Sequence, residues 1–291
     1  MPAFQALRRM TRRQETHDAP GGGAPERKER SLLVAIPIDL FAYAGYYLAN
    51  LLFLLLSLPF ALLLAPVPGF KQRLFLRVAR AYARFLTQVY LPALGVCRIV
   101  SITGLENRPP HGSFICVANH RGRLDALLLT GVLTNTAVLI KAKHARYPML
   151  AHLVRHCGFI SVDQASTASI TAALRKCGSL LASGTNLLVF PEGARTTGAR
   201  LRRFGSMAFK VAMDQGSPIV PVVVHPESPF MARKLVTFFP RKPVHYRIRF
   251  LPVAYPGERE SAEDFCDRVY RRMASELKSL DRGTEWENIS S

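Results

Sequence analysis

A long apolar run interrupts an otherwise mixed pattern early in the chain. Residues 40–70 contain no charged side chain and are dominated by Leu, Phe, Ala and Tyr. The core of the run, Leu40 to Leu64, would form a helix about 37 Å long at 1.5 Å per residue, whereas the hydrocarbon layer of a bilayer is about 30 Å thick. A buried core helix rarely stays apolar on every face over such a length, so the pattern predicts a membrane-embedded helix. A long polar stretch precedes the run, which favours a retained anchor over a cleaved signal peptide.

The residues around this anchor leave its topology open. Arginines lie on both sides of it, so the positive-inside rule does not orient it. Pro59, Pro66 and Pro68 near its end allow a kinked or re-entrant hairpin that returns both flanks to the cytoplasmic side. We therefore expect residues 31–70 to form a membrane-embedded helix or helical hairpin. Residues 1–30, rich in Arg, Glu, Pro and Gly, are expected to be a disordered basic tail.

The next stretch, Lys71 to Val100, has an amphipathic pattern. Its arginines Arg73, Arg77, Arg80 and Arg84 are spaced by four, three and four positions, with apolar residues between them. This spacing predicts a basic helical region over residues 71–100 that lies along a lipid headgroup layer, where each basic residue contributes about 1 kcal/mol.

From residue 101 to residue 291 the pattern becomes that of an α/β domain. Short apolar or β-branched runs predict strands at residues 113–117, 137–140, 158–162, 186–190, 219–224 and 246–251. Helical patterns lie at residues 123–133, 147–156, 168–182, 207–215 and 261–280. Strands that alternate with helices of this length predict a mostly parallel central sheet covered by helices.

The composition narrows the classes of partner. A formal net charge of +19 in 291 residues implies a field that attracts anionic lipid, an anionic substrate or nucleic acid. Nucleic acid is disfavoured because the basic residues surround a hydrophobic anchor and lack aromatic interleaving or a recognition motif. The five cysteines have no C-x-x-C pair, so we expect neither a disulfide framework nor a metal site, but core cysteines in a reducing compartment.

A histidine and an aspartate define the first candidate site. The strand that ends at Val117 places Asn119 and His120 at its carboxyl end, where open α/β sheets bind their ligands. Asp125 follows at the first turn of the next helix, within reach of one imidazole nitrogen if Gly122 makes the bend. Such a pair can act as a general base. Alternatively, His120 is an ordinary helix-entry residue and Asp125 a first-turn acid favoured by the helix dipole.

A second candidate site follows the strand that begins at Asn186. Gly193 allows a tight turn and a close approach of the backbone to a ligand, and Arg195 offers a planar fork to phosphate. Glu192 is placed to orient that fork or a hydroxyl group. A surface turn with a solvated arginine is the alternative.

Four sequence blocks, in order, resemble those of the glycerolipid acyltransferase family, typified by lysophosphatidic acid acyltransferase. The blocks are NHRGRLD at residues 119–125, GFISVDQ at 158–164, VFPEGAR at 189–195 and PIVPVVV at 218–224. Ordered blocks are far more specific than any one of them. The resemblance covers roughly residues 100–250, and the upstream apolar segment is similar to the arrangement of the family.

The resemblance implies a membrane-bound enzyme that transfers an acyl group directly from acyl-CoA or acyl carrier protein to a hydroxyl group. His120 would be the base and Asp125 its orienting partner, and no cofactor and no serine or cysteine nucleophile would be needed. The acceptor would be a lysophospholipid, foremost 1-acyl-glycerol-3-phosphate, which becomes phosphatidic acid. The site is expected on the cytoplasmic face of the membrane, which would be the inner or plasma membrane if the protein is bacterial. The residues expected to bind substrate are Asn119, Lys141, Gln164, Glu192, Gly193 and Arg195.

The sequence departs from the family pattern in its second block. Gln164 follows Asp163 where the family usually has Arg, and a neutral amide can hydrogen-bond an anion but adds no charge. Ala194 replaces a usual Thr, which is a milder change. Three hypotheses follow: Arg195 alone holds the acceptor phosphate, the acceptor is a different lyso-lipid or a secondary-metabolite glycerolipid, or the chain is a non-catalytic membrane lipid-binding protein.

Overall fold

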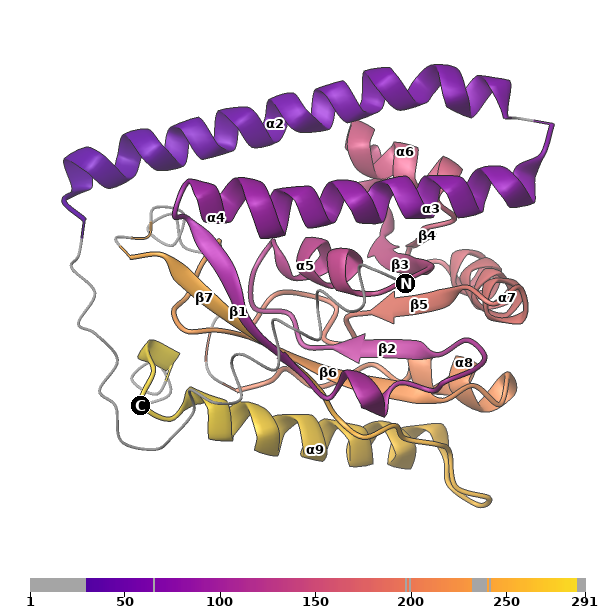
Figure 1. Cartoon of the computed structure of the whole chain (residues 1–291). Helices are drawn as coiled ribbons and strands as arrows, with labels where there is room; N and C mark the ends of the chain where they lie inside the picture. Colours follow the sequence, from indigo (N-terminus) through magenta and orange to yellow (C-terminus); the bar gives the residue numbers. More distant parts are fainter. Residues whose placement is uncertain are drawn as a thin grey trace.

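The computed structural model describes residues 30–64, 66–196, 198, 200–231, 240 and 242–286, so the predicted tail lies outside the described residues except for Arg30. Its centre is a seven-stranded sheet in the order β1-β7-β6-β2-β5-β3-β4 (Figure 1). Strands β6 and β7 pair antiparallel, whereas the other described pairs are parallel. The strands are β1 (Cys97–Thr103), β2 (Ile115–Ala118), β3 (Thr136–Lys141), β4 (Ile160–Val162), β5 (Asn186–Val189), β6 (Ile219–Pro226) and β7 (Val244–Phe250).

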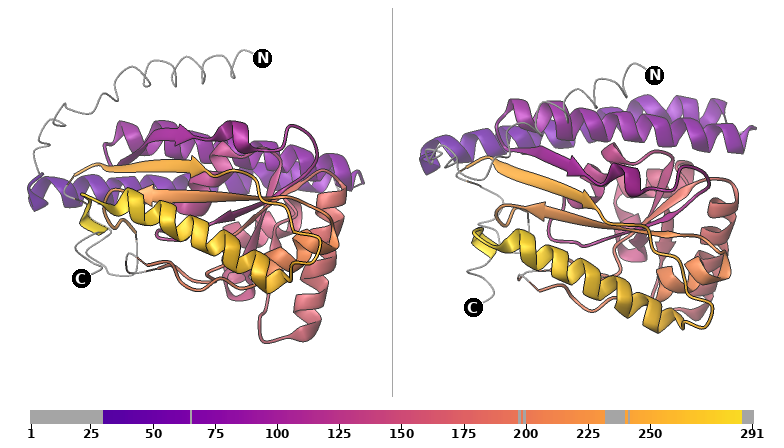
Figure 2. Two further views of the ribbon diagram at one scale, coloured as in Figure 1. Left: turned by 90° about the horizontal axis from the view of Figure 1, so that it is seen from below. Right: turned by 60° about the horizontal axis from the view of Figure 1, so that its bottom comes forward.

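Helices cover both faces of the sheet, which confirms the predicted fold class. Helices α3 and α5 lie on one face with α2 outside them, and α9 lies on the opposite face (Figures 1 and 2). The helices are α2 (Leu32–Leu63), α3 (Pro68–Phe85), α4 (Leu91–Ala93), α5 (Asp125–Val132), α6 (Pro148–His156), α7 (Thr167–Ala182), α8 (Met207–Asp214) and α9 (Ala262–Asp281).

The central strands are buried on both sides, which explains their continuous apolar sequences. Every residue of β2, β5 and β6 is buried. Parallel strands that are covered by helices on both faces have no solvent-facing positions, so apolar and polar residues do not alternate along them. All five cysteines of the chain are also buried.

The end of the region 71–100 differs from the expected helix, because it forms a strand at one edge of the sheet. Helix α3 ends at Phe85, a π-helical turn covers Leu86–Tyr90, and strand β1 begins at Cys97. The prediction of a helical region up to Val100 was therefore wrong at its end. A bulge between Ile99 and Ser101 interrupts the pairing of β1 with β7, so the two-residue alternation that marks a strand is broken.

The apolar segment forms the first arm of a helical hairpin with α3 (Figure 1). The chain reverses between Leu63 and Pro68, and Pro68 occupies the first position of α3, where its missing N–H costs nothing. The two arms meet at the rings of Phe53 and Tyr82, whose centroids lie 4.8 Å apart. An apolar stretch within Leu33–Leu63 has a mean hydropathy of 1.9, and only 17% of that stretch is buried inside the structure. Helix α2 is therefore a candidate membrane helix.

Candidate functional site

The loop after β2 is fixed to the neighbouring strand by Asn119. The Asn119 side-chain amide donates to the Val224 carbonyl at 2.9 Å, and its oxygen accepts from the Val224 N–H at 2.7 Å. The residue is fully buried. Asn119, expected to bind substrate, thus uses its amide to continue the pairing of β2 with β6, and it sets the position at which the next residue, His120, leaves the sheet.

His120 and Asp125 form the hydrogen-bonded pair at the centre of the site. The His120 Nδ1 atom lies 2.9 Å from Asp125 Oδ2. The same oxygen accepts the backbone N–H groups of Arg121 at 2.7 Å and Gly122 at 2.8 Å, and Asp125 is fully buried. Three donors on one buried carboxylate oxygen fix the orientation of the Asp125 side chain.

The opposite edge of the imidazole is partly exposed. The His120 side chain is 21% exposed, and its ring lies 4.5 Å from the Phe190 ring between centroids. No described residue hydrogen-bonds its Nε2 atom. With Nδ1 held as a donor to Asp125, Nε2 is the basic nitrogen and is positioned to accept a proton.

Gly122 allows the tight return of the chain to Asp125. A Cβ atom at this position would lie 2.8 Å from the Phe230 carbonyl oxygen and 3.4 Å from Asp125 Oδ1. The first distance is shorter than any stable contact of this kind, so a larger residue would displace the loop. The bend expected at Gly122 is therefore a close approach between two backbone segments.

Glu192 joins the second candidate site to the first. Its Oε1 atom accepts the His120 N–H at 2.7 Å, and its Oε2 atom accepts the Arg202 N–H at 3.1 Å and the Thr196 hydroxyl. The Thr196 N–H in turn donates to the His120 carbonyl at 2.7 Å. Burial raises the pKa of Glu192, although these hydrogen bonds oppose the shift. Glu192 was expected to bind substrate, and its carboxylate here holds the backbone of His120.

The remaining predicted residues lie near His120, and two of them, Lys141 and Arg195, form a basic cluster. Gly193 has φ +62°, and a Cβ atom there would lie 3.8 Å from Gln164 Nε2 and 3.9 Å from Lys141 Nζ. Arg195 donates to the Met231 carbonyl at 2.9 Å. Burial and the charges of Lys143, Lys141 and Arg195 lower the pKa of the nearby His144. The positive charges that contribute to this shift would stabilise an anion at the same place.

A buried network behind the histidine was not anticipated from the sequence. The Arg121 guanidinium donates to both carboxylate oxygens of Asp281, at 2.6 and 2.7 Å, and only 1% of the arginine is exposed. His225 Nε2 lies 3.1 Å from Asp281 Oδ1. Burial would raise the pKa of Asp281, but the hydrogen bonds from Arg121 and His225 outweigh it and lower the pKa. Burial lowers the pKa of His225.

Trp286 packs against the arginine of the same network. The Arg121 guanidinium carbon lies 4.1 Å from the Trp286 ring centroid, in a cation–π arrangement, and Trp286 Nε1 donates to the Pro226 carbonyl at 2.7 Å. The residue that follows His120 is therefore held by the end of α9 and the segment after it. Separations of 160 residues along the chain leave no local sequence signal for such a contact.

Comparisons with known proteins place this site in context. Residues 99–225 match the family model described as acyltransferase. The chain is 29% identical over 139 residues to a 1-acyl-sn-glycerol-3-phosphate acyltransferase of Borreliella burgdorferi, covering 47% of this chain and 55% of that protein. It is 27% identical over 186 residues to the human 1-acyl-sn-glycerol-3-phosphate acyltransferase alpha, covering 62% and 64%. The matches to these curated relatives thus span little more than half of their length.

A solved structure is similar over most of the fold. The 1-acyl-sn-glycerophosphate (LPA) acyltransferase PlsC from Thermotoga maritima matches with a TM-score of 0.68 and 19% identity, covering 85% of this chain and 98% of that one. At this identity the likeness concerns the fold. The match of residues 99–225 to the acyltransferase family model confirms the resemblance that the sequence blocks indicated.

Proposed function

We propose that this chain, whose residues 99–225 match the acyltransferase family model, is a membrane-bound O-acyltransferase that transfers an acyl group from acyl-CoA or acyl carrier protein to a lysophospholipid. The proposed acceptor is 1-acyl-glycerol-3-phosphate and the product phosphatidic acid, in agreement with the names of the relatives. The observation that carries the proposal is the hydrogen bond between His120 Nδ1 and Asp125 near the positive charges of Lys141 and Arg195.

In the proposed reaction, His120 Nε2 takes the proton of the acceptor hydroxyl as its oxygen attacks the thioester carbonyl carbon. The carbon–sulfur bond then breaks, and the imidazolium returns the proton to the departing thiolate. Asp125 stabilises the imidazolium through Nδ1. General base assistance of this kind contributes about 10²- to 10⁴-fold in rate. No acyl-enzyme and no bound cofactor take part.

The basic cluster is the proposed site of the acceptor phosphate. Lys141 and Arg195 provide positive charge, and the backbone at Gly193 allows a close approach. Gln164 lies at the same place with a neutral amide. That observation favours a second candidate, the same chemistry on a lyso-lipid other than 1-acyl-glycerol-3-phosphate.

The proposed membrane attachment rests on α2, whose leucines are largely exposed. Such an apolar surface is stable in lipid and unfavourable in water. An active site on the cytoplasmic face would have access to acyl-CoA and acyl carrier protein, and anionic lipid would attract the positive chain.

The test is an acyl-transfer assay with purified protein in detergent. Several lyso-lipids are offered with each donor, and mass spectrometry identifies the products. We expect phosphatidic acid from 1-acyl-glycerol-3-phosphate, and no product from a folded His120→Ala variant. Product from another lyso-lipid alone would favour the second candidate. Lipid binding without transfer to any acceptor would identify a non-catalytic lipid-binding protein and overturn the proposal.

A further inference from the structure

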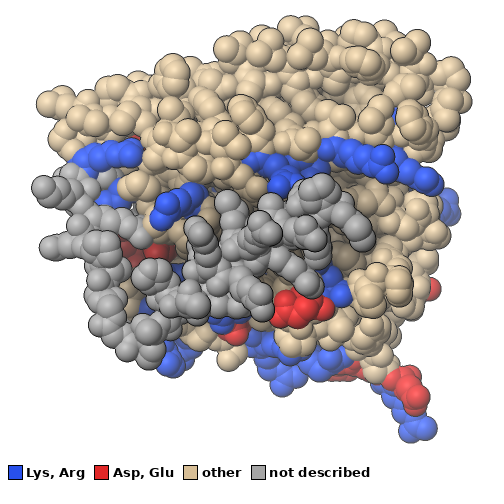
Figure 3. Space-filling model, viewed as in Figure 1, with Lys and Arg blue, Asp and Glu red and all other residues tan. Residues whose placement is uncertain are grey.

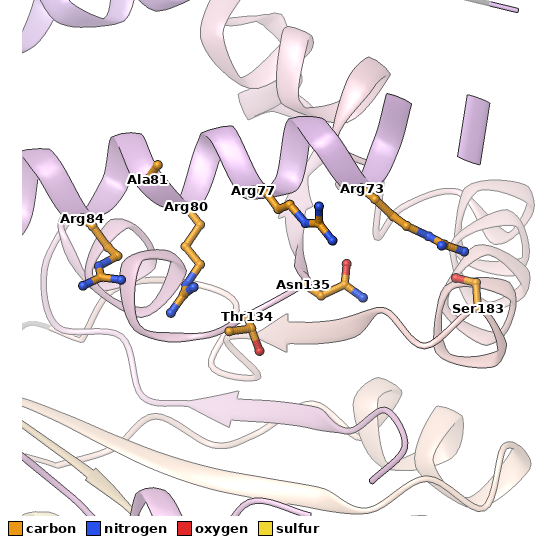
Figure 4. Close-up of a pocket in the computed structure, with 8 residues that line it drawn as sticks. All are labelled: Arg73, Arg77, Arg80, Ala81, Arg84, Thr134, Asn135 and Ser183. Carbon is orange, nitrogen blue, oxygen red and sulfur yellow. The ribbon is translucent and has the colours of Figure 1, made fainter. Parts of the chain in front are cut away.

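A cavity of about 590 Å³ lies between α3 and the turns that precede β3 and β5. Four arginines of α3 extend toward it, and Asn135 and Ser183 face them from the two turns (Figure 4). These arginines are Arg73, Arg77, Arg80 and Arg84. The sequence predicted that these arginines lie along a headgroup layer, and the structure adds a cavity toward which their side chains extend.

The charge of this cavity is not balanced by the described residues around it. Its described lining contains arginines and neutral residues and no carboxylate. The Arg80 Nε atom is buried and has no described hydrogen-bond partner. Burial and the charges of Arg84 and Arg108 lower the pKa of Arg80. A partly buried cluster of like charges is costly unless an anion enters it.

Helix packing explains only part of this arrangement. The Arg84 backbone nitrogen lies 3.3 Å from the position that a Cβ atom would take at Gly131, near the carboxyl end of α5. The partial negative charge of that helix end offsets roughly half a unit charge. Arg73 and Arg77 are exposed and lie nearer the amino end of α3 than Arg84. The cluster therefore carries more positive charge than its packing against α5 requires.

The cavity lies away from the His120 site. Asn135 and Ser183 come before β3 and β5, at the amino ends of parallel strands, whereas His120 and Glu192 follow the carboxyl ends of β2 and β5. The two sites thus lie at opposite ends of the parallel strands. A ligand in the cavity has no direct contact with the His120–Asp125 pair.

We propose that this cavity binds the phosphate group of an anionic membrane lipid. Guanidinium groups match phosphate in geometry and can bind it through paired hydrogen bonds. A lipid is favoured as the source because α2, which exposes Leu55, Leu58 and Leu62, runs beside α3. Lysine and arginine side chains form a row directly below this apolar layer (Figure 3). With α2 among acyl chains, the row lies at the depth of the headgroups.

The experiment measures the binding of dioctanoyl-phosphatidylglycerol to the full chain in neutral detergent, by the shift in its thermal unfolding. This lipid is neither substrate nor product of the proposed reaction, and the readout needs no turnover, so the result is independent of the proposed function. We expect the wild type to be stabilised and Arg77→Gln/Arg80→Gln to bind roughly 25-fold more weakly, or about fivefold for each arginine.

The matched control is Arg271→Gln/Arg272→Gln, which removes the same charge from exposed positions of α9 on the other face of the sheet. It should retain the wild-type affinity. If Arg77→Gln/Arg80→Gln does not fold, Arg73→Gln/Arg77→Gln replaces it, because both side chains are exposed. Equal losses in both double variants, no binding by the wild type, or equal stabilisation by inorganic phosphate or CoA would each overturn the proposal.

Discussion

The guanidinium group of Arg121 forms two hydrogen bonds with the carboxylate of Asp281, the last residue of α9. The backbone N–H of the same arginine donates to Asp125 at 2.7 Å. One residue thus connects the end of α9 to the carboxylate that orients His120. The arginine is buried, and the Asp281 carboxylate compensates its charge at hydrogen-bond distance.

Asp281→Ala should destabilise the protein and slow its turnover. The substitution removes the carboxylate that accepts two hydrogen bonds from the buried Arg121, and loss of one member of a buried ion pair costs about 3–5 kcal/mol. Because the loop that carries His120 also loosens, we expect kcat to fall at a permissive temperature while KM for the acceptor changes little. Denaturant unfolding and steady-state kinetics in detergent measure the two effects.

The control for Asp281→Ala is the double variant Arg121→Met/Asp281→Leu. Replacing both charged side chains with apolar groups removes the buried arginine charge together with its carboxylate, so much of the lost stability should return. A low kcat that persists in this stable variant would identify Arg121 as a positioning residue. Wild-type stability and kcat in Asp281→Ala would contradict the assignment.

Asp125→Asn should lower kcat by about 10²- to 10⁴-fold, the range of general base assistance. The Oδ2 atom of Asp125 accepts three N–H donors, from His120, Arg121 and Gly122. An amide there has no charge to stabilise the imidazolium, and one orientation would place an NH₂ group against these donors. Acyl-transfer rates measure the loss, and circular dichroism shows whether the fold is retained. A variant with unchanged kcat would exclude the orienting role.

Sequence patterns predicted the sheet well where a strand is fully buried and poorly where it is at an edge. Strands β2, β5 and β6 appear as apolar runs because both of their faces are covered. Strand β1 is half-exposed and interrupted by a bulge, so its sequence shows neither a continuous apolar run nor a clear alternation. The preceding helical pattern therefore obscured it.

The candidate site shows a similar contrast between local and long-range contacts. His120 and Asp125 are five positions apart, on either side of the bend at Gly122. This short spacing predicted a contact that the structure contains. The contacts of Asn119 with Val224, and of Arg121 with Asp281, join segments more than 100 residues apart. Such contacts depend on how strands and helices pack, and one sequence read alone contains no signal for them.

Gln164→Arg should strengthen the binding of a phosphate-bearing acceptor. Gln164 lies beside Lys141 at the Gly193 turn, so an arginine there adds a positive charge to the cluster. A charged hydrogen bond is worth about 1.5 kcal/mol or more, so KM for 1-acyl-glycerol-3-phosphate should fall about tenfold. Gln164→Glu is the opposite control and should raise KM. If Gln164→Arg has little effect while another lyso-lipid is already a good substrate, the acceptor is that lipid.

Gly122→Ala should reduce kcat more than it changes acceptor binding. The added Cβ atom would lie 2.8 Å from the Phe230 carbonyl oxygen, so the loop between His120 and Asp125 must move. Displacements of about 1 Å in a catalytic group cost about 10²-fold in rate. Gly69→Ala is a suitable control, because a Cβ atom there would have no neighbour within 4 Å and the backbone at Gly69 does not have a positive φ. Equal kinetics for the two alanine variants would show that the loop tolerates the shift.

Acidification should destabilise the packing of α6 against the helical hairpin. Burial, followed by the charges of His152, Lys71 and Arg155, lowers the pKa of His156 from 6.5 to about 4. A group with a lowered folded-state pKa stabilises the protein fully above pH 6.5 and loses that contribution as pH falls toward 4. The neighbouring His152 lies 2.9 Å from the Ser57 hydroxyl of α2, and burial also lowers its pKa.

Thermal unfolding in detergent between pH 7 and pH 4 tests this prediction. We expect the unfolding temperature to fall across this interval, and the fall to be shallower in His156→Phe, which keeps an aromatic ring against Phe75. His111→Gln, an exposed change outside this contact, is the matched control and should follow the wild type. A His156→Phe profile parallel to the wild type would contradict the role of His156, because the linkage requires the pH dependence to disappear with the titrating group.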